Sequence, residues 1–423
     1  MTEVGDVLRG DRSRDLAEII SELDGPGLAP FADESIAFCD ALSRRLFRDP
    51  AGREHRELHV LAYWLRRASV HRLGTAFADE TPDGAVTVPR GLAFHVPPTN
   101  VDTMAIYSLA LSLLVGNRNL VRISPRRSPQ MTALLNALAS TLADPRFATV
   151  AAGTALISYG HEDEPTALAS SACDVRVIWG GDQTVDRLRQ FPLGPHGKEV
   201  VFGDRFSFAI ISAQAWLDAS PERRDELARA LYDDSFWFDQ MGCASPRLLV
   251  WCGTSDAAAA AAEDLYPRLA GVITAHGYVL EVGAAMTKWT YAFGAAADRP
   301  VNLARREGNE LMVLRLDTLD AFDRTHPGAG LFFEAIVPEL SDLAGFVSRK
   351  DQTLTAFGFE EEELRSFVTS TNGRGVDRVV AFGQALAFDR IWDGMNLLAE
   401  FTRQVVVQPT AARPLAVAES PAP

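Results

Sequence analysis

The segment Gly91-Leu-Ala-Phe-His-Val-Pro-Pro-Thr-Asn100 marks a change in the pattern of the sequence. From Gly91 onward, short apolar runs alternate with stretches of helical periodicity, an order that is typical of a doubly wound parallel sheet. Ligands bind such sheets at the carboxyl ends of the strands. The residues that follow each strand are therefore the first candidates for a binding site. The predicted strands cover 92–96, 119–123, 155–159 and 175–179, and the predicted helices cover 104–114, 131–142, 165–172 and 184–190.

The N-terminal residues have a different pattern, in which helical periodicity dominates. Leu16, Ile19, Ile20 and Leu23 are spaced i, i+3, i+4 and i+7, so their side chains share one face of a helix. We therefore predict an N-terminal helical region over residues 1–90.

Length, charge and cysteine content narrow the class of protein. A chain of 423 residues is long enough for about two to three domains. Its formal net charge of -15 argues against nucleic acid as a partner. The four cysteines form no CxxC pair, no apolar run is long enough to span a bilayer, and the N-terminus has no secretory pattern. We expect a cytoplasmic protein with reduced thiols and without membrane insertion.

The eight histidines are scattered along the chain, and the sequence predicts no metal site. Only His55 and His59 have the i,i+4 spacing that places two ligands on one helix face. They lie in a charged segment, which favours a solvated helix face over a metal site.

One cysteine has a sequence context that suggests chemistry. Cys243 lies in Phe236-Trp-Phe-Asp-Gln-Met-Gly-Cys-Ala-Ser-Pro246, ahead of an apolar run at 247–252 that is typical of a buried strand. Pro246 restricts the residue before it to non-helical conformations, so we expect a turn that exposes the sulfur in a cleft. A thiolate is a strong nucleophile for carbonyl carbon when nearby cations lower its pKa, and Arg247 is the adjacent cation. The alternative is that Cys243 is a small apolar core residue.

Polar side chains follow the first two predicted strands. The amide of Asn100 can donate a hydrogen bond to a developing oxyanion, although an asparagine in such a turn is often a local cap. Arg122, Ser124 and Arg126 lie in the run Arg122-Ile-Ser-Pro-Arg-Arg127 that ends the second strand. Their guanidinium and hydroxyl groups suit an adenosine ribose and its 2′-phosphate, and a solvated basic turn is the alternative.

The fourth predicted strand ends in a glycine pair. Gly180 and Gly181 precede a predicted helix, so the backbone there can approach a pyrophosphate closely. The GxGxxG fingerprint of dinucleotide-binding folds is absent from the sequence.

In this order, the motifs resemble the aldehyde dehydrogenase superfamily: a strand, a Pro-x-Asn turn, a helix, Gly116-Asn117, a strand ending in a basic residue and serine, a Gly-Gly turn and a later cysteine. Three segments resemble its acyl-CoA reductase branch, of LuxC type. They are Asp239-Gln-Met-Gly-Cys-Ala-Ser-Pro246, Val177-Ile-Trp-Gly-Gly181 and Ile391-Trp-Asp-Gly394. The resemblance extends from about residue 91 to residue 407.

The resemblance implies roles for the candidate residues. Cys243 would accept the acyl group, and Asn100 with the Cys243 backbone amide would form the oxyanion hole. Arg122 and Ser124 would meet the adenosine ribose, and Gly180 and Gly181 the pyrophosphate. Glu334, in Glu334-Ala-Ile-Val-Pro338, would hold the nicotinamide ribose, and its alternative is an exposed turn glutamate.

The resemblance also implies an architecture of two doubly wound Rossmann-like α/β domains with the N-terminal helical region 1–90 packed on the cofactor domain. We expect a dinucleotide-binding domain at 91–235 and a catalytic cysteine domain at 236–375. The segment 376–407 would return to the cofactor domain and supply a strand that joins subunits into a homo-oligomer. Residues 408–423 are rich in alanine and proline, which predicts a disordered tail.

The resemblance and one departure from it predict the direction of the reaction. At the position where hydrolytic aldehyde dehydrogenases have a water-activating glutamate, this chain has Val201, with Glu199 two residues away as a possible substitute. Without that base an acyl-cysteine should persist long enough to accept hydride. We therefore expect NAD(P)H-dependent reduction of an acyl thioester, carried on coenzyme A or an acyl carrier protein, to the aldehyde. An oxidative aldehyde dehydrogenase, a cysteine acyltransferase or hydrolase without hydride transfer, and a silent partner protein are the alternatives.

The sequence predicts the cofactor and the acyl group less precisely than it predicts the reaction. Arg122, Arg126 and Arg127 without a nearby acidic residue favour NADPH, and NADH is the alternative. The aromatic approach to Cys243 suits either an apolar acyl channel or domain core. A fatty acyl group follows from the resemblance, and an aryl or short functionalised acyl group stays open.

Overall fold

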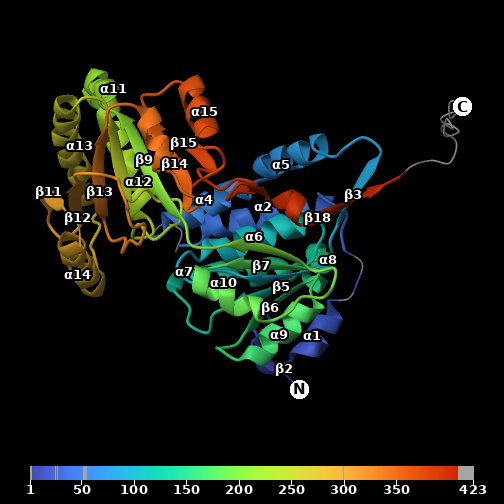
Figure 1. Cartoon of the computed structure of the whole chain (residues 1–423). Helices are drawn as coiled ribbons and strands as arrows, with labels where there is room; N and C mark the ends of the chain where they lie inside the picture. Colours follow the sequence, from blue (N-terminus) through green and yellow to red (C-terminus); the bar gives the residue numbers. More distant parts are fainter. Residues whose placement is uncertain (1, 24, 26, 51–54, 299, 408–423) are drawn as a thin grey trace, which may run out of the picture.

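The computed structural model describes residues 2–407 apart from 24, 26, 51–54 and 299. Within these ranges the chain builds two seven-stranded sheets, each with helices packed against it (Figure 1). Strand side chains alternate between two apolar clusters, as Leu120 and Val121 do in the first sheet, so both faces of the sheet are covered. This confirms the predicted fold of two doubly wound α/β units.

The first sheet has the order β2-β1-β6-β5-β4-β7-β8. Its strands β4 to β8 run parallel, and β4 has β5 on one side and β7 on the other. The chain therefore reverses its winding direction at β4, and the crevice between the carboxyl ends of β4 and β7 is the place where such folds bind ligands. These strands are β4 (Leu92–Val96), β5 (Arg118–Ile123), β6 (Thr154–Ser158), β7 (Val175–Trp179) and β8 (Lys198–Phe202).

The predicted helices of this unit are confirmed, with ends within two residues of the expected ones. Every residue of α6 is buried, because this helix lies between the sheet and the N-terminal helices. The helices are α6 (Thr103–Leu114), α7 (Pro129–Leu142), α8 (Ala148–Ala152), α9 (Asp163–Ala172) and α10 (Asp182–Arg189).

The N-terminal region is not purely helical, which corrects the expectation for residues 1–90. β1 (Glu3–Asp6) and β2 (Asp11–Asp15) extend the first sheet, with β1 antiparallel to β6. The sequence of β2 is Asp-Arg-Ser-Arg-Asp, so this edge strand is held by main-chain pairing and has no apolar alternation that would reveal it. The N-terminal helices are α1 (Leu16–Glu22), α2 (Asp33–Arg48), α4 (Arg56–Trp64) and α5 (Arg67–Asp79).

The second sheet has the order β11-β12-β13-β10-β9-β14-β15, and all its neighbours are parallel except β11 and β12. Its strands are β9 (Phe206–Ser212), β10 (Leu248–Cys252), β11 (Val301–Glu307), β12 (Leu311–Leu316), β13 (Leu331–Val337), β14 (Asp351–Phe357) and β15 (Arg378–Ala381). Its helices are α11 (Ala213–Asp218), α12 (Pro221–Phe236), α13 (Ser255–Ala275), α14 (Val282–Asp298) and α15 (Glu361–Ser370).

Both expected limits of the catalytic domain are wrong. The chain leaves the first sheet after β8 and enters the second at β9, so the change falls at residues 203–205 and not at 235. At the other end, β15 pairs with β14 in the second sheet, so the return to the first unit comes after 381 and not at 376. Apolar periodicity identifies these strands but does not tell which sheet they join.

The last described segment returns to the first unit and ends in a ribbon. β16 (Ile391–Trp392) and β17 (Met395–Asn396) form a small hairpin, and α16 (Leu397–Glu400) packs against the core of the first unit. β18 (Thr402–Val406) then pairs with β3 (Ala85–Pro89), away from both sheets (Figure 1). The predicted tail 408–423 lies outside the described residues. In the described part of the chain, no helix has the length and apolarity needed to cross a membrane.

Candidate active site

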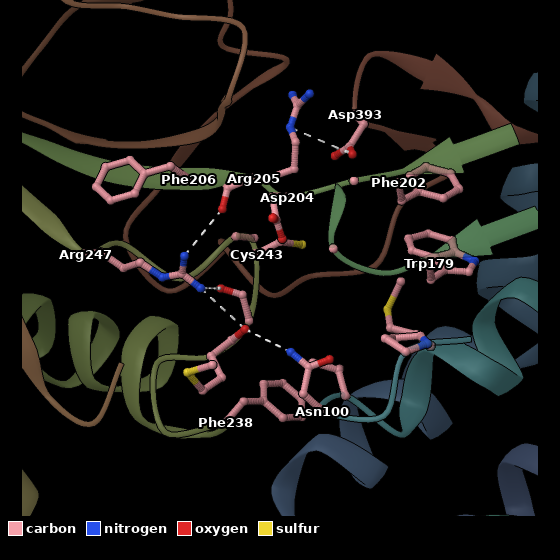
Figure 2. Close-up of a pocket in the computed structure, with 18 of the residues that line it drawn as sticks. Asn100, Trp179, Phe202, Asp204, Arg205, Phe206, Phe238, Cys243, Arg247 and Asp393 are labelled. Carbon is pink, nitrogen blue, oxygen red and sulfur yellow. Dashed lines mark hydrogen bonds and ion pairs between the residues drawn. The ribbon is translucent and has the colours of Figure 1, made fainter. Parts of the chain in front are cut away.

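A cavity of about 610 Å³ lies between the two units and contains Cys243 in its wall (Figure 2). The carboxyl ends of β4, β7 and β8 line one side of it, and the segment 237–247, called here the cysteine loop, lines another. The crossover 203–205 between the two sheets also faces the cavity. The lining residues include Asn100, Met104, Trp179, Gly180, Gly181, Phe202, Asp204, Arg205, Trp237, Phe238, Met241, Cys243, Arg247, His326, Phe388, Trp392 and Asp393.

The cysteine loop has an unusual backbone that side chains hold in place. Asp239 and Gln240 have φ angles of 51° and 62°, in the left-handed region that non-glycine residues rarely adopt. Gln240 is fully buried, and its Nε2 donates to the carbonyl of Pro246 at 2.9 Å. The loop therefore closes on itself around the position of Cys243.

Arg247 holds the same loop from its carboxyl end. Its buried guanidinium donates to the carbonyls of Gln240 at 3.3 Å, Gly242 at 3.4 Å and Arg205 at 3.3 Å. These acceptors come from the cysteine loop and from the crossover, so one cation joins both walls of the cavity (Figure 2). Burial lowers the pKa of Arg247 below its usual range.

Cys243 is half-buried, and its thiol is not activated in this structure. Burial raises the pKa of Cys243 to about 11, and the Asp393 carboxylate adds to this effect. The side chains of Gln352, Arg247 and Arg205 act in the opposite direction. The expected cation is therefore present, but desolvation outweighs it, and the sulfur carries its proton near neutral pH.

Asn100 lies beside the cysteine loop in the wall of the cavity. It follows β4, and its Nδ2 donates to the carbonyl of Met241 at 3.3 Å. The structure therefore brings Asn100 and Cys243 together in one cavity, although they are far apart in the sequence (Figure 2).

Gly180 and Gly181 also line this cavity, at the start of α10. A Cβ atom on Gly181 would lie 2.9 Å from Oδ1 of Asp204, and one on Gly180 would lie 3.1 Å from the Thr184 side chain. Glycine therefore keeps the backbone accessible where a helix begins. The first N–H groups of a helix have no partner within it and suit a phosphate group.

Arg122, Ser124 and Arg126 lie at the carboxyl end of β5, outside the lining of the cavity. Arg122 donates from Nη2 to the carbonyl of Gly160 at 2.6 Å, and its guanidinium lies 4.7 Å from the centre of the Tyr159 ring. Its buried Nε has no partner among the described residues. Ser124 accepts a hydrogen bond at Oγ from the backbone N–H of Arg126, whose side chain is exposed.

Glu334 does not lie where the resemblance implies. It is fully buried in β13, outside the lining of the cavity. One carboxylate oxygen pairs with Arg315 at 2.6 Å, and the other accepts from Trp251 at 3.0 Å and from the hydroxyl of Tyr266. This internal network occupies the carboxylate, so Glu334 is a core residue and neither a ribose ligand nor an exposed turn residue.

Val201 and Glu199, the two residues considered at the position of a water-activating base, both lie outside the lining of the cavity. Val201 packs with the cluster on the far face of the first sheet, whereas Phe202 faces the cavity and stacks on Trp179 with ring centroids 3.6 Å apart. Glu199 forms ion pairs with Arg176 at 2.6 Å and Arg189 at 2.8 Å and does not line the cavity. Neither Val201 nor Glu199 therefore presents a base to Cys243.

Of the large apolar residues that precede Cys243 in the sequence, some line the cavity and one lies in the core. Trp237, Phe238 and Met241 line the cavity, but Phe236 is buried and stacks on Tyr232. Sequence reasoning missed further cavity residues, among them Asp204, Arg205, His326 and Asp393. Asp393 lies in the quoted Ile391-Trp-Asp-Gly394 motif, which was the available signal. Within the described ranges, no group of three or more His, Cys, Asp or Glu side chains is arranged to hold a metal ion.

One family model matches part of this chain. Residues 75–273 match the family model described as acyl-CoA reductase (LuxC). The family resemblance predicted from the motifs is thereby confirmed.

Two relatives agree with the acyl-CoA reductase (LuxC) match. Over 199 residues the chain is 25% identical to the long-chain acyl-protein thioester reductase of Aliivibrio fischeri, covering 46% of this chain and 36% of that protein. Over 307 residues it is 21% identical to the Vibrio harveyi protein of the same name, covering 70% and 59%. The chain thus spans less than two thirds of these relatives.

Solved aldehyde dehydrogenases share the fold of the whole chain. One from Mycobacterium tuberculosis, complexed with NAD+, has a TM-score of 0.65 at 12% identity and covers 98% of this chain and 96% of its own. Aldehyde dehydrogenase 21 from Physcomitrella patens has a TM-score of 0.66 at 11% identity, with 97% and 95% covered. At this identity the likeness concerns the fold alone.

Proposed function

We propose that this chain reduces an acyl thioester to the aldehyde through an acyl-cysteine at Cys243. The observation that carries the proposal is the shared cavity, in which Cys243 faces Asn100 and the Gly180-Gly181 turn at the point where the first sheet reverses its winding. The match to the acyl-CoA reductase (LuxC) family and the names of the two relatives support the same reaction.

Acylation uses groups of the chain alone. The sulfur of Cys243 attacks the thioester carbonyl carbon, and the carbonyl electron pair moves to oxygen. Asn100 Nδ2 and the Cys243 backbone N–H donate to that oxyanion, as fixed donors do in other acyl-transfer enzymes. The carbon–sulfur bond to the carrier then breaks and releases the carrier as a thiolate. This thiolate takes up one proton, which balances the proton that Cys243 released.

The residues present fit a dinucleotide. Gly180 and Gly181 would hold the pyrophosphate at the start of α10, and Arg122 and Ser124 would hold the adenosine ribose. Arg122 and Arg126 would neutralise a 2′-phosphate, so we propose NADPH in preference to NADH. When bound, the reduced nicotinamide supplies the hydride that takes the acyl-cysteine to the oxidation level of the aldehyde.

The walls near Cys243 favour reduction over hydrolysis. Phe202 stacks on Trp179 beside the cavity, and the carboxylate of Glu199 is held in two ion pairs away from it. Glu199 is therefore not placed to activate water against an acyl-cysteine, which favours hydride transfer over hydrolysis.

The apolar lining of the cavity also indicates the class of acyl group in the substrate. Met104, Trp237, Phe238 and Phe388 supply apolar lining, which suits the chain of a fatty acyl group. We propose a long-chain acyl thioester, on coenzyme A or on an acyl carrier protein, as the substrate.

The assembly and the location that we propose for the enzyme follow from two features of the chain. The β3–β18 ribbon exposes Val86 and Val406, and we propose that it pairs with another copy in a homo-oligomer. The four cysteines are free thiols, as expected in the reducing cytoplasm, where we place the enzyme.

The decisive experiment follows NADPH consumption with acyl-CoA and acyl carrier protein thioesters of several chain lengths while the aldehyde is trapped. We expect one aldehyde formed for each NADPH consumed. Cys243→Ala should abolish both the turnover and the acyl adduct seen by intact mass spectrometry, whereas Cys252→Ala, in a buried strand, should retain the adduct. Acyl transfer to water or to another thiol without NADPH consumption would refute the reductase and favour a transferase or hydrolase.

A further inference from the structure

Lys288 places its ammonium group in the interior of the second unit. It lies on α14, which packs against the second sheet, and its side chain is fully buried (Figure 1). It forms no ion pair with a described residue, and Nζ donates to the backbone carbonyls of Asn309 and, at 2.6 Å, Ala329. Burial lowers the pKa of Lys288 to about 8, with the charge of Glu310 opposing this effect, so the ammonium prevails at neutral pH. A buried cation is costly unless hydrogen bonds compensate it, so these two carbonyls stabilise it there.

One of these carbonyls belongs to a turn with a rare backbone, called here the Ala329 turn. Its residues Gly328, Ala329 and Gly330 have φ angles of 70°, 61° and 70°, all in the left-handed region. Alanine is strained in that region, so contacts outside the turn must stabilise it. The carbonyl of Ala329 accepts from Lys288, and the backbone N–H of Ala329 donates to the carbonyl of Asp239 at 2.6 Å. The turn is therefore held on both sides.

The Ala329 turn packs directly against the cysteine loop. Asp239 is the first of the two left-handed residues of that loop, so the hydrogen bond from Ala329 reaches its strained part. A Cβ atom on Gly328 would lie 2.5 Å from the carbonyl oxygen of Asp239 and 2.7 Å from the sulfur of Met241. Glycine is required at this position because the two backbones touch. Each link from Lys288 to the cysteine loop is thus a direct contact.

Other contacts hold different parts of the cysteine loop. Arg247 donates to the carbonyl of Gln240, the residue after Asp239. The hydroxyl of Tyr278 donates to the side chain of Asp239, at Oδ1, 2.8 Å away. The main-chain carbonyl of Asp239 accepts from the Ala329 turn. Loss of the Lys288 ammonium would therefore loosen this end of the loop while Arg247 keeps the other end in place.

On these contacts, and resting on the nucleophilic role proposed above, we propose that Lys288 is a positioning residue for Cys243. Its ammonium fixes the Ala329 turn, the turn fixes the left-handed part of the cysteine loop, and the loop sets where the sulfur lies relative to Asn100. Lys288 itself lies outside the lining of the cavity. Acyl transfer requires the sulfur, the carbonyl carbon and the oxyanion donor in one geometry, so a small shift of the loop lowers the rate of reaction and not the affinity for substrate.

Hydrogen exchange of the full chain without ligand, read by mass spectrometry, tests whether Lys288 holds the loop. Lys288→Met removes the ammonium but keeps a long side chain. The backbone amides of Met241, Ser245 and Ala329 donate hydrogen bonds within the cysteine loop or onto it. In Lys288→Met their exchange should accelerate by about tenfold more than exchange of the β10 amides, because the opening is local to the loop.

Steady-state kinetics with an acyl-CoA thioester and NADPH test whether the loop positions the sulfur. Lys288→Met should lower kcat by about tenfold to a hundredfold and leave KM for the thioester unchanged, because the sulfur moves while the apolar lining of the cavity stays. Ser43→Ala is the matched control, since it also removes a buried side-chain hydrogen bond, to the carbonyl of Ala62, outside the cavity lining. It should keep the wild-type kcat and KM and show no preferential exchange in the cysteine loop.

The outcomes separate positioning from a merely structural role. Equal acceleration of exchange in the cysteine loop and in β10 would mean that Lys288 only stabilises the fold, and this would overturn the proposal. Wild-type exchange in the loop, or a raised KM with unchanged kcat, would overturn it as well. If Lys288→Met does not fold, Lys288→Gln, which keeps a donor, is judged by the same outcomes with smaller effects expected. If the wild type has no reductase activity, the proposed function fails, and hydrogen exchange still decides whether Lys288 holds the loop.

Discussion

Asn100 donates from Nδ2 to the backbone carbonyl of Met241, 3.3 Å away, and this hydrogen bond joins the end of β4 to the cysteine loop. Asn100 belongs to the first unit and Met241 to the second, so the contact holds the proposed oxyanion donor beside the loop that contains the proposed nucleophile. Nδ2 has two N–H bonds, of which this contact uses one. The side chain is therefore already oriented at the cavity that contains Cys243.

Replacing Asn100 by alanine should lower the rate of acyl transfer by about a hundredfold to a thousandfold, since one oxyanion donor is lost. Rapid mixing with an acyl-CoA followed by intact mass spectrometry measures that rate. The acyl-enzyme should still form, more slowly. Asn136→Ala, at an exposed position of α7, is the matched control. An acylation rate for Asn100→Ala equal to that of the wild type would remove Asn100 from the oxyanion hole.

Acylation of Cys243 should accelerate as the pH rises. The pKa of the thiol is about 11, so the reactive thiolate is a small fraction at neutral pH. Below that pKa the fraction grows about tenfold for each pH unit. Single-turnover acylation measured from about pH 7 to about pH 9 should follow this slope. A plateau within that range would mean that the bound thioester lowers the thiol pKa.

Gly181→Ala should weaken NADPH binding, because the new Cβ would lie 2.9 Å from Asp204 Oδ1 and would stand where the backbone approaches the pyrophosphate. We expect a dissociation constant raised by about tenfold, measured by tryptophan fluorescence quenching, which corresponds to about 1.4 kcal/mol. Gly271→Ala is the control, since a Cβ there meets open space on α13. Equal binding by the two variants would argue against the glycine turn as the phosphate site.

Arg126→Ala should discriminate between the two nicotinamide cofactors. Its exposed guanidinium, at the end of β5, would contact only the 2′-phosphate. We expect kcat/KM for NADPH to fall by about tenfold while kcat/KM for NADH is unchanged. Steady-state assays with each cofactor measure both values. A parallel loss for both would indicate a role in the shared part of the nucleotide, and no loss would favour a solvated basic turn.

Arg247→Met should destabilise the protein, because it removes the buried guanidinium that donates to the carbonyls of Gln240, Gly242 and Arg205. We expect a loss of about 2–4 kcal/mol in the free energy of unfolding, measured with urea. Arg127→Met, at an exposed position, should change it by less than about 0.5 kcal/mol. Stability of Arg247→Met equal to that of wild type would mean that the cysteine loop does not depend on this cation.

Local pattern was sufficient for the elements around the site. The apolar runs of β4 and β7 end at the predicted residues, and the Asn100 and Gly180-Gly181 turns follow them. The alternation of apolar residues in strands and their helical periodicity depend only on residues that are near in sequence, so both can be recognised without knowledge of the fold. The same reasoning failed for β2, a charged edge strand whose stability comes from main-chain pairing.

Local sequence patterns did not identify residues whose role depends on which face of the sheet they occupy or on which side chains they pair with. Val201 and Phe202 are both apolar and adjacent, and only the pairing of β8 with β7 decides that Phe202 faces the cavity. Glu334 is the glutamate of the quoted motif, yet in the core its carboxylate pairs with Arg315 and accepts a hydrogen bond from Trp251. The sequence of β8 alone does not indicate which way Phe202 faces, and the sequence of β13 alone does not indicate the partners of Glu334.

The sequence by itself determined where β4 to β7 and the helices α6, α7, α9 and α10 lie and which cysteine stands next to a turn, because those features follow from apolar period and backbone restriction. Only the tertiary structure decided which sheet β9 and β15 join, and that Arg205 and Asp393 line the same cavity as Cys243. The physical reason is that burial and charge act through space. The pKa of a thiol is set by groups that packing brings near it, from wherever in the chain they come.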